Sequence, residues 1–200
     1  MTYRLDSEQG MLQDAARSFF EKEVSGDLIR EQEKSETGFN RKLWNKMADL
    51  GWMGLTIPEI YDGFEAGFMY LAVVLEELGR SGLASPYFHT VALGVEMINA
   101  LGSEQQKTAI LPRVVTGEVI LSVAYAGADE PRSVADLPLS ASANGDIFTL
   151  YGSCLMVPYA HVANYIICAA RCGDQEIRLF LLEPDTPGLT INSLQTTAQD

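Results

Sequence analysis

Residues 103–126 read SEQQKTAILPRVVTGEVILSVAYA, and the repeat of apolar positions in this stretch changes at Gly117. Before Gly117 the apolar residues recur at helical spacing, whereas after it they form short runs rich in residues that favour strands. Ser103 and Gln106 have the spacing of a capping box, which predicts a helix that begins there and ends near Val115. The change of repeat therefore predicts an α+β chain, with a helical part followed by a stranded part.

The part of the chain before Gly117 carries the signals of several more helices. The candidate cap residues are Asp6, Ser7, Asn40 and Ser85. Residues 67–78 are apolar on almost every side, which predicts a central helix. Pro86 suits the first position of a helix that would run to Leu101. We predict an N-terminal helical bundle as a domain of residues 1–117.

Residues 118–200 contain short segments rich in β-formers. Turn signals such as Asn144-Gly145 and Pro187-Gly188 separate these segments at the spacing of an antiparallel meander or barrel. We predict an antiparallel, barrel-like β-domain over residues 118–200, incomplete at its C-terminal end. The order of helices first and strands second argues against a doubly wound nucleotide-binding fold, and neither a GxGxxG motif nor a P-loop is present.

Charge and composition exclude several classes of partner. The net charge of −13 predicts no nucleic-acid partner and no anionic membrane surface. No apolar run approaches the length of a membrane helix, and the N-terminal residues resemble no targeting segment, so we predict a soluble, cytoplasmic protein. The three cysteines lack CxxC spacing and the two histidines are isolated, so we predict no metal site.

The residues taken by themselves name no reaction. No Ser/His/Asp set, metal spacing or phosphate loop stands out. Trp44 and Trp52 fall at helical spacing, which favours core packing over a cofactor role. Glu76 and Glu77 end the predicted central helix, and we predict a solvated or capping role for them rather than catalysis. His89 is predicted to lie at the surface or at the edge of a cleft.

Three motifs, in order along the chain, resemble those of the acyl-CoA dehydrogenase family. Residues 51–63, GWMGLTIPEIYDG, resemble a glycine loop that ends in P-E-E-Y-G-G in the family. Residues 101–118 contain LGSEQQK, LP and GE, and resemble G-[ST]-E-E-Q-K…LP…GE, which is the most specific match. Residues 145–170 resemble the D-G-D…L-N-G-T-K…A-D segment of the middle domain. The resemblance spans almost the whole chain.

This resemblance implies an FAD-dependent acyl-CoA dehydrogenase that acts on an acyl-CoA thioester. In the family a carboxylate removes the α-proton while the β-hydrogen leaves as hydride to flavin N5. An electron-accepting flavoprotein and a homotetramer or heterotetramer are implied as partners. The catalytic glutamate of the family lies on a C-terminal helical bundle, so we expect no catalytic base in this chain and place it C-terminal to Asp200.

The resemblance also assigns site residues. Those aligned with the flavin contacts are Tyr125, Ala126, Gly127, Met156, Val157 and Pro158, and those aligned with the CoA contacts are Arg132 and Ser133. The family's A-L-T-E-P threonine corresponds to Ala126 and its W-I-T threonine to Pro158, so two hydroxyl groups are absent. Each lost hydrogen bond is worth about 0.5 to 1.5 kcal/mol. The alternatives are therefore a non-catalytic or weakly flavin-binding subunit of a heteromeric acyl-CoA dehydrogenase, and a stand-alone acyl-CoA binding module.

Overall fold

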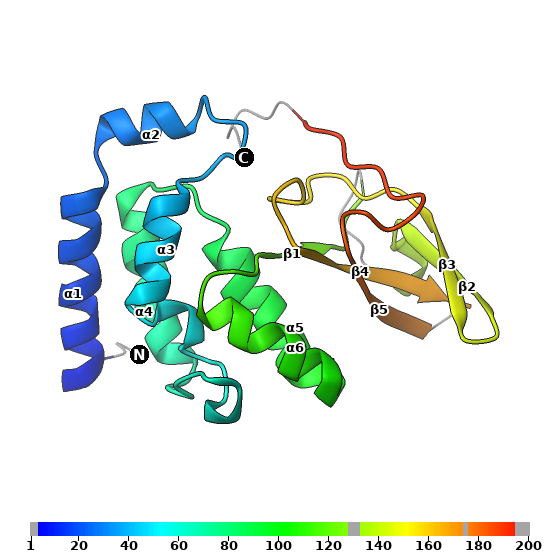
Figure 1. The fold of residues 1–200 in the computed structure, drawn as a ribbon, viewed down its shortest axis with the longest axis horizontal. Helices are drawn as coiled ribbons and strands as arrows, with labels where there is room; N and C mark the ends of the chain where they lie inside the picture. Colours follow the sequence, from blue (N-terminus) through cyan, green and yellow to red (C-terminus); the bar gives the residue numbers. More distant parts are fainter. Residues whose placement is uncertain (1–3, 128–132, 174–175, 195–200) are drawn as a thin grey trace.

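The computed structural model describes residues 4–127, 133–173 and 176–194, with the helices on one side and the sheet on the other (Figure 1). The helices are α1 (Ser7–Glu23), α2 (Gly26–Gln32), α3 (Arg41–Asp49), α4 (Phe68–Ser81), the π-helix η3 (Phe88–Val95), α5 (Glu96–Leu101) and α6 (Glu104–Val115). The strands are β1 (Leu121–Ala124), β2 (Leu139–Asn144), β3 (Ile147–Gly152), β4 (Tyr165–Cys172) and β5 (Glu176–Leu182). The predicted order of helices before strands, an α+β arrangement, is confirmed.

Local capping signals begin three of the helices where the sequence predicts. Asp6, rather than Ser7, caps α1 and accepts a hydrogen bond of 2.8 Å from the backbone N–H of Gln9. Asn40 caps α3 in the same way, and the capping box of Ser103 begins α6. A side-chain acceptor at these positions pairs with an N–H that has no partner inside the helix, which fixes the first turn.

The helix predicted from Pro86 to Leu101 is present but is not a uniform α-helix. Residues 88–95 form the π-helix η3, and α5 continues directly from it. The wide turns lie where this helix is pressed against β1, because a Cβ atom at Gly94 would lie only 2.6 Å from the Cβ of Leu121. The altered register therefore accompanies a tertiary contact that helical spacing alone does not reveal.

The strands form one open sheet, so the predicted antiparallel barrel is wrong. β4 pairs antiparallel with β5 along one edge and parallel with β1 along the other. β2 also joins β4 in parallel, at Ser140 and Arg171, and continues into the β2–β3 hairpin, which is antiparallel. The turn signals of the sequence specify which neighbours form hairpins. They do not specify that the long connections before β2 and β4 return the chain in a parallel direction, which leaves a mixed sheet.

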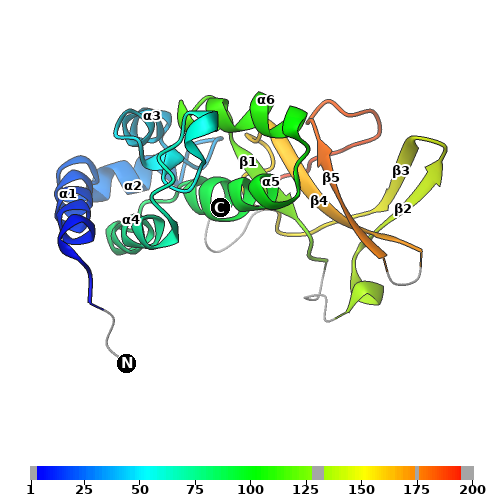
Figure 2. The ribbon, with the colours of Figure 1, turned by 90° about the horizontal axis from the view of Figure 1, so that it is seen from below.

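The helical and stranded parts meet around Gly117 and share hydrophobic contacts. Figure 2 shows α5 and α6 between the other helices and the sheet. Gly117 has a φ angle of 73°, and its carbonyl oxygen accepts a hydrogen bond of 2.7 Å from the indole N–H of Trp44. Trp44 is only 1% exposed, as its predicted core role requires, and belongs to a cluster that also contains Ile166 of β4.

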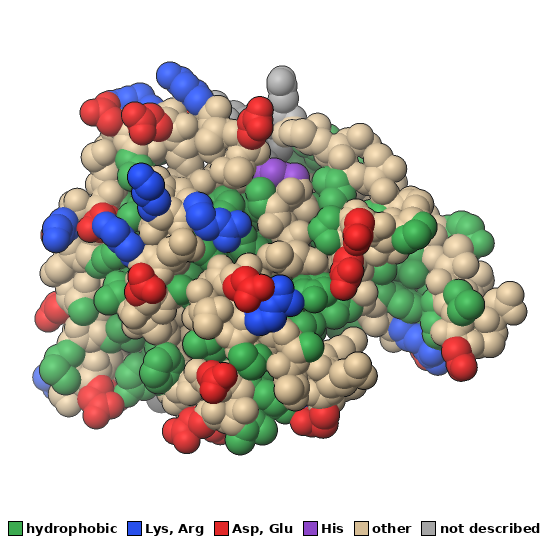
Figure 3. Space-filling model, in the orientation of Figure 1, with side chains coloured by type: hydrophobic (Ala, Val, Ile, Leu, Met, Phe, Trp, Pro, Cys, Tyr) green, Lys and Arg blue, Asp and Glu red, His purple; other side chains and the backbone are tan. Residues whose placement is uncertain are grey.

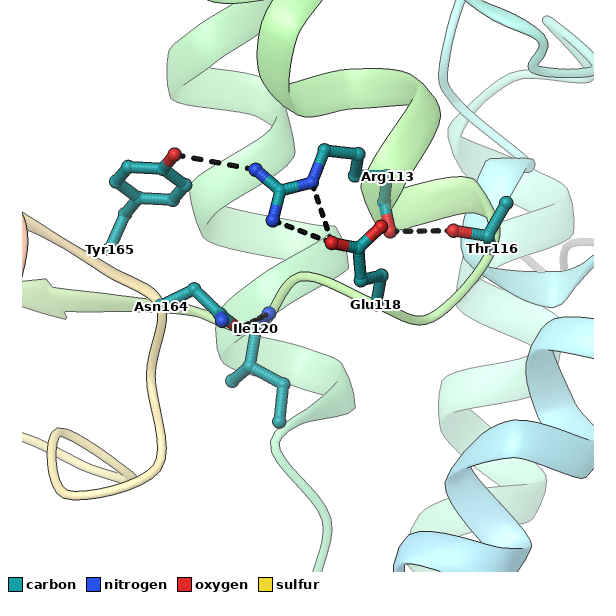
Figure 4. Close-up of polar contacts among 6 residues, drawn as sticks. All are labelled: Arg113, Thr116, Glu118, Ile120, Asn164 and Tyr165. Carbon is teal, nitrogen blue, oxygen red and sulfur yellow. Dashed lines mark hydrogen bonds and ion pairs between the residues drawn. The ribbon is translucent and has the colours of Figure 1, made fainter.

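Polar contacts fasten the end of α6 to the sheet (Figure 4). The guanidinium group of Arg113 donates to the carboxylate of Glu118 at 2.6 and 2.9 Å and reaches the hydroxyl of Tyr165 at 3.5 Å. The backbone N–H of Ile120 donates to the side-chain oxygen of Asn164 at 2.8 Å. These contacts hold the residues before β1 next to the residues that begin β4, so the parallel pair begins in register.

Glu77 is buried and paired with arginines, so the predicted solvated or capping role is wrong. Its carboxylate accepts hydrogen bonds from Nε and Nη2 of Arg17 at 3.3 and 2.8 Å, and lies 3.1 Å from Nε of Arg80. The hydrogen bond from Arg17, together with its charge, holds the pKa of Glu77 below its ordinary value, although burial acts in the opposite direction. The pair joins α1 to α4 across sixty residues of sequence.

Charged side chains of both signs lie over the helical part of the visible face (Figure 3). The basic ones lie mainly in its upper half, acidic ones continue to its lower edge, and apolar side chains reach the surface over the sheet. Among the described residues, no helix combines the length and the apolar character needed to cross a membrane. No group of three or more His, Cys, Asp or Glu side chains in the same part of the chain is arranged to hold a metal ion.

Candidate functional site

A pocket of about 290 Å³ lies between η3 and the sheet. Its lining includes residues that follow β1 and residues of the loop between β3 and β4. The lining residues are Phe88, His89, Leu93, Val123, Tyr125, Ala126, Gly127, Leu155, Met156, Val157 and Pro158. The pocket thus has a helical wall and a wall built from the β-strand connections.

The six residues aligned with flavin contacts all line this one pocket. They come from residues 125–127 and 156–158, which are far apart in the sequence but adjacent in space. The backbone N–H of Leu155 donates to the carbonyl oxygen of Ala126 at 3.0 Å. The buried hydroxyl of Ser122 donates to the carbonyl oxygen of Pro158 at 2.7 Å. These two hydrogen bonds hold the segments together as a continuous wall.

The loop that forms this wall has an unusual backbone conformation. Met156 and Tyr159 adopt positive φ angles of 53° and 57°, which L-residues other than glycine rarely do. Such conformations cost roughly 1 to 3 kcal/mol each and persist where the surrounding structure dictates them. Met156 is 73% exposed, whereas Tyr159 is buried with its ring edge-on to Phe39. The buried tyrosine therefore anchors a loop that presents an apolar methionine at the pocket.

The helical wall is fixed to β1 by one threonine and one glycine. The buried hydroxyl of Thr90 donates to the carbonyl oxygen of Leu121 and accepts from its backbone N–H, both at 3.1 Å. Gly94 lets the helix approach Leu121 closely, because a Cβ atom at this position would lie only 2.6 Å from the Cβ of Leu121. Phe88, His89 and Leu93 are thereby placed at the pocket. The resemblance did not identify this wall, although the isolated Gly94 in a helical pattern is a signal of close packing.

The residues aligned with CoA contacts are not part of this pocket as described. Ser133 is exposed, and its hydroxyl donates to the carboxylate of Asp136 at 3.0 Å. Arg132 lies outside the described residues. His89 is half-buried at the pocket, in agreement with the prediction of a surface or cleft-edge histidine.

The described lining is apolar and uncharged apart from the titratable side chains of His89 and Tyr125. Burial raises the pKa of the Cys168 thiol on β4 to about 12, so this thiol is protonated at neutral pH. The pocket volume of about 290 Å³ lies just below the range of about 300 to 1,000 Å³ for small-molecule pockets. The pocket therefore suits a flat ring system or a short apolar chain, but is too small for a whole dinucleotide.

Comparison with known proteins identifies the family. Residues 6–118, more than half of the chain, match the family described as acyl-CoA dehydrogenase, N-terminal domain. The chain belongs to the acyl-CoA dehydrogenase family. Its predicted membership is thus confirmed. The matched residues comprise the helices and the junction around Gly117 between the helical and stranded parts.

Relatives of this family member match almost all of its residues. The probable acyl-CoA dehydrogenase YngJ of Bacillus subtilis is 29% identical over 96% of this chain and 52% of its own length. The ChsE4-ChsE5 complex from Mycobacterium tuberculosis has a TM-score of 0.87, with 26% identity over 97% of this chain and 52% of that one. A glutaryl-CoA dehydrogenase from Mycobacterium smegmatis in complex with FADH2 has a TM-score of 0.84 at 25% identity, over 96% of this chain and 49% of that one. The chain spans about half the length of these relatives.

Proposed function

We propose that this chain forms the flavin-facing and acyl-CoA-facing platform of an FAD-dependent acyl-CoA dehydrogenase, with its helical and β parts divided at residues 117 and 118. The observation that carries the proposal is the convergence of residues 125–127 and 156–158 on one pocket. Two comparisons support the proposal: the family membership of the chain and its structural likeness to a glutaryl-CoA dehydrogenase in complex with FADH2. FAD, when bound, supplies the acceptor for the hydride that leaves the acyl chain.

The residues of the pocket would bind and orient the flavin ring rather than take part in proton transfer. The side chains of Tyr125 and Met156 offer apolar contact surface, and the hydrogen bonds to Ala126 and Pro158 keep the wall in shape. No carboxylate lines the pocket among the described residues. We therefore assign the described lining residues no part in removal of the α-proton, and keep Arg132 and Ser133 as proposed CoA contacts.

Binding of the flavin tests this proposal. The protein is purified with any subunit that accompanies it, and FAD is titrated while flavin fluorescence and absorbance are recorded. We expect FAD to bind, and Ala126→Thr, which restores the hydroxyl of the family, to tighten binding by about two- to tenfold. Ala143→Thr, on the exposed part of β2, is the matched control and should leave FAD affinity unchanged. Absence of any FAD binding by the purified protein would refute the proposal.

A second candidate function is that of a non-catalytic or weakly flavin-binding subunit in a heteromeric acyl-CoA dehydrogenase. Ala126 and Pro158 favour it, because both stand where the family has a hydroxyl group. The structural likeness to a chain of the ChsE4-ChsE5 complex adds support. This candidate predicts co-purification with a flavin-carrying paralogue and transfer of electrons to a flavoprotein acceptor only by the assembled complex. A homotetramer that oxidises acyl-CoA without any paralogue would exclude it.

A further inference from the structure

Arg171, one residue before the end of β4, is a cation that no carboxylate pairs with among the described residues. The stranded part contains three arginines, Arg132, Arg171 and Arg178, and no lysine. The guanidinium group of Arg178 pairs with the carboxylate of Glu176 at 2.6 Å, and Arg132 lies outside the described residues. An arginine left without such a pairing, in a chain whose net charge is −13, can take an anion from outside the chain as its partner.

The backbone on either side of this guanidinium group fixes where it lies. Nη1 of Arg171 donates to the carbonyl oxygen of Ala135 at 3.2 Å, in the short helix η4 (Val134–Asp136). The backbone of Arg171 is held as well, because β2 joins β4 in parallel at Ser140 and Arg171 (Figure 1). A guanidinium group has five N–H donors, and the bond to Ala135 occupies one of them. Arg171 is therefore an oriented donor with N–H groups to spare.

The segment that holds Arg171 also carries Ser133, a proposed CoA contact, and leads back to the pocket. Ser133 directly precedes η4, and the carboxylate of Asp136 accepts its hydroxyl hydrogen bond rather than pairing with Arg171. Farther along, a Cβ atom at Gly127 of the pocket would lie 3.2 Å from the Cβ of Pro138. Neither Arg171 nor Ser133 lines the pocket itself. This segment therefore connects the wall of the pocket to the guanidinium group.

We propose that Arg171 binds the phosphate groups of the CoA moiety of the acyl-CoA. The inference rests on the proposed function, since it concerns the thioester that this platform would receive. CoA carries its pyrophosphate and its 3′-phosphate at the end remote from the thioester, so these anions need a partner outside the pocket that faces the flavin. A guanidinium group pairs with phosphate oxygens through two parallel N–H groups. Because the rest of the chain is strongly acidic, one unpaired guanidinium group determines where such a polyanion can bind.

Thioesters with and without the phosphate groups test this proposal. The purified protein, with FAD and any co-purifying subunit, is titrated with butyryl-CoA, butyryl-3′-dephospho-CoA and butyryl-pantetheine. We expect Arg171→Gln to weaken the binding of butyryl-CoA by about three- to tenfold. The same variant should bind butyryl-pantetheine, which lacks the phosphates, as the unaltered protein does. A loss for butyryl-CoA alone would assign the 3′-phosphate to Arg171, and a loss for both CoA esters would assign the pyrophosphate.

The chain offers a matched control in Arg178, which is already paired with Glu176. Arg178→Gln should leave all three affinities unchanged, and Arg171→Lys, which keeps the charge without the paired donors, should retain part of the affinity for the CoA esters. Equal loss for all three esters in Arg171→Gln would show that the bond to Ala135 only shapes the segment, and would overturn the inference. Unchanged affinities in that variant would also overturn it while leaving the proposed function intact. Failure of the unaltered protein to bind FAD would instead refute the proposed function.

Discussion

The helical part and the β2–β3 hairpin distribute polar and apolar groups in opposite ways. In the helical part the carboxylate of Glu77 is buried and paired, and the indole N–H of Trp44 is bonded to Gly117. In the hairpin, large apolar side chains lie at the surface, including Ile147 at 71% and Tyr151 at 59% exposure. Figures 1 and 2 show the hairpin at the far end of the sheet from the helices. β1 and β4 contribute Ala124 and Ile166 to the hydrophobic cluster of the helices, and β2 contributes Leu139 at its first residue. Because the rest of the hairpin lies outside that buried cluster, we expect it to contribute less to global stability.

Replacing one aromatic residue in each region should give the largest difference. Trp44→Ala removes a side chain that is 1% exposed together with its hydrogen bond, and we expect a loss of about 3 to 5 kcal/mol in the free energy of unfolding. Phe148→Ala removes a half-buried ring on β3 whose partner is Phe180, with centroids 5.3 Å apart. For this variant we expect a loss of about 1 to 2 kcal/mol. Denaturant unfolding followed by circular dichroism measures both, and equal losses would contradict the unequal contribution of the two regions.

Two helical glycines separate close packing against β1 from helix propensity. Gly94→Ala places a methyl group against Leu121, and we expect overpacking to destabilise the protein by about 1 to 3 kcal/mol. Gly79 lies in α4, and a Cβ atom added there would have no neighbouring atom within 4 Å outside the local helix backbone. Gly79→Ala should therefore stabilise the protein by about 0.4 to 1 kcal/mol. Thermal unfolding of both variants measures the difference. A shift in the same direction for both would show that η3 is not fixed against β1.

A second pair of glycines compares the junction of the helical and stranded parts with the hairpin turn. Gly117 and Gly145 both have positive φ angles, of 73° and 63°, so alanine should cost about 1 kcal/mol in either place from the backbone alone. At Gly117 the new Cβ would also lie 2.9 Å from the Cβ of Ala48, whereas at Gly145 nothing lies within 4 Å. We therefore expect Gly117→Ala to cost about 1 kcal/mol more than Gly145→Ala. Equal free energies of unfolding for the two variants would mean that the structure around Gly117 accommodates the added methyl group as easily as the hairpin turn at Gly145.

Local signals in the sequence were sufficient for the starts of three helices, and family motifs were sufficient for one wall of the pocket. The capping residues Asp6, Asn40 and Ser103 act within one helical turn, so they can be recognised without knowledge of the fold. Family motifs singled out residues 125–127 and 156–158, which line one pocket in the structure, because a motif records a spatial relation that its members share. Whether they contact a flavin remains a prediction.

The missed features depend on contacts between distant segments. The parallel pairing of β4 with β1 and β2 follows from long connections whose path no turn residue specifies. Glu77 resembles any acidic residue at a helix end, and only the packing of α1 on α4 brings Arg17 to it. The helical wall of the pocket depends likewise on Thr90 meeting the backbone of Leu121. Periodicity reports which face of a helix is buried, but not which group it meets.

The contribution of the buried Glu77 carboxylate to the free energy of unfolding should depend on pH. At neutral pH we expect this effect to be the smallest of the four predictions. Because the hydrogen bond and charge of Arg17 lower the pKa of Glu77 in the folded state, its contribution to stability is fully present above the unfolded-state pKa, near the ordinary value of 4.5. That contribution is lost as the pH falls through the lower folded-state pKa. Glu77→Gln removes the titration and should flatten the fall in the free energy of unfolding between neutral and acidic pH.

The effect is expected to be modest because water reaches the arginine partners, whose side chains are 35% exposed at Arg17 and 57% at Arg80. A glutamine can also still accept a hydrogen bond from Arg17. Glu76→Gln, one residue away on the exposed side of α4, removes the same formal charge without the buried contacts. Urea unfolding at a series of pH values separates the two variants. If both flatten the acid limb equally, net charge rather than the pairing of Glu77 governs acid stability, and the helical part no longer differs from the hairpin in its use of buried polar groups.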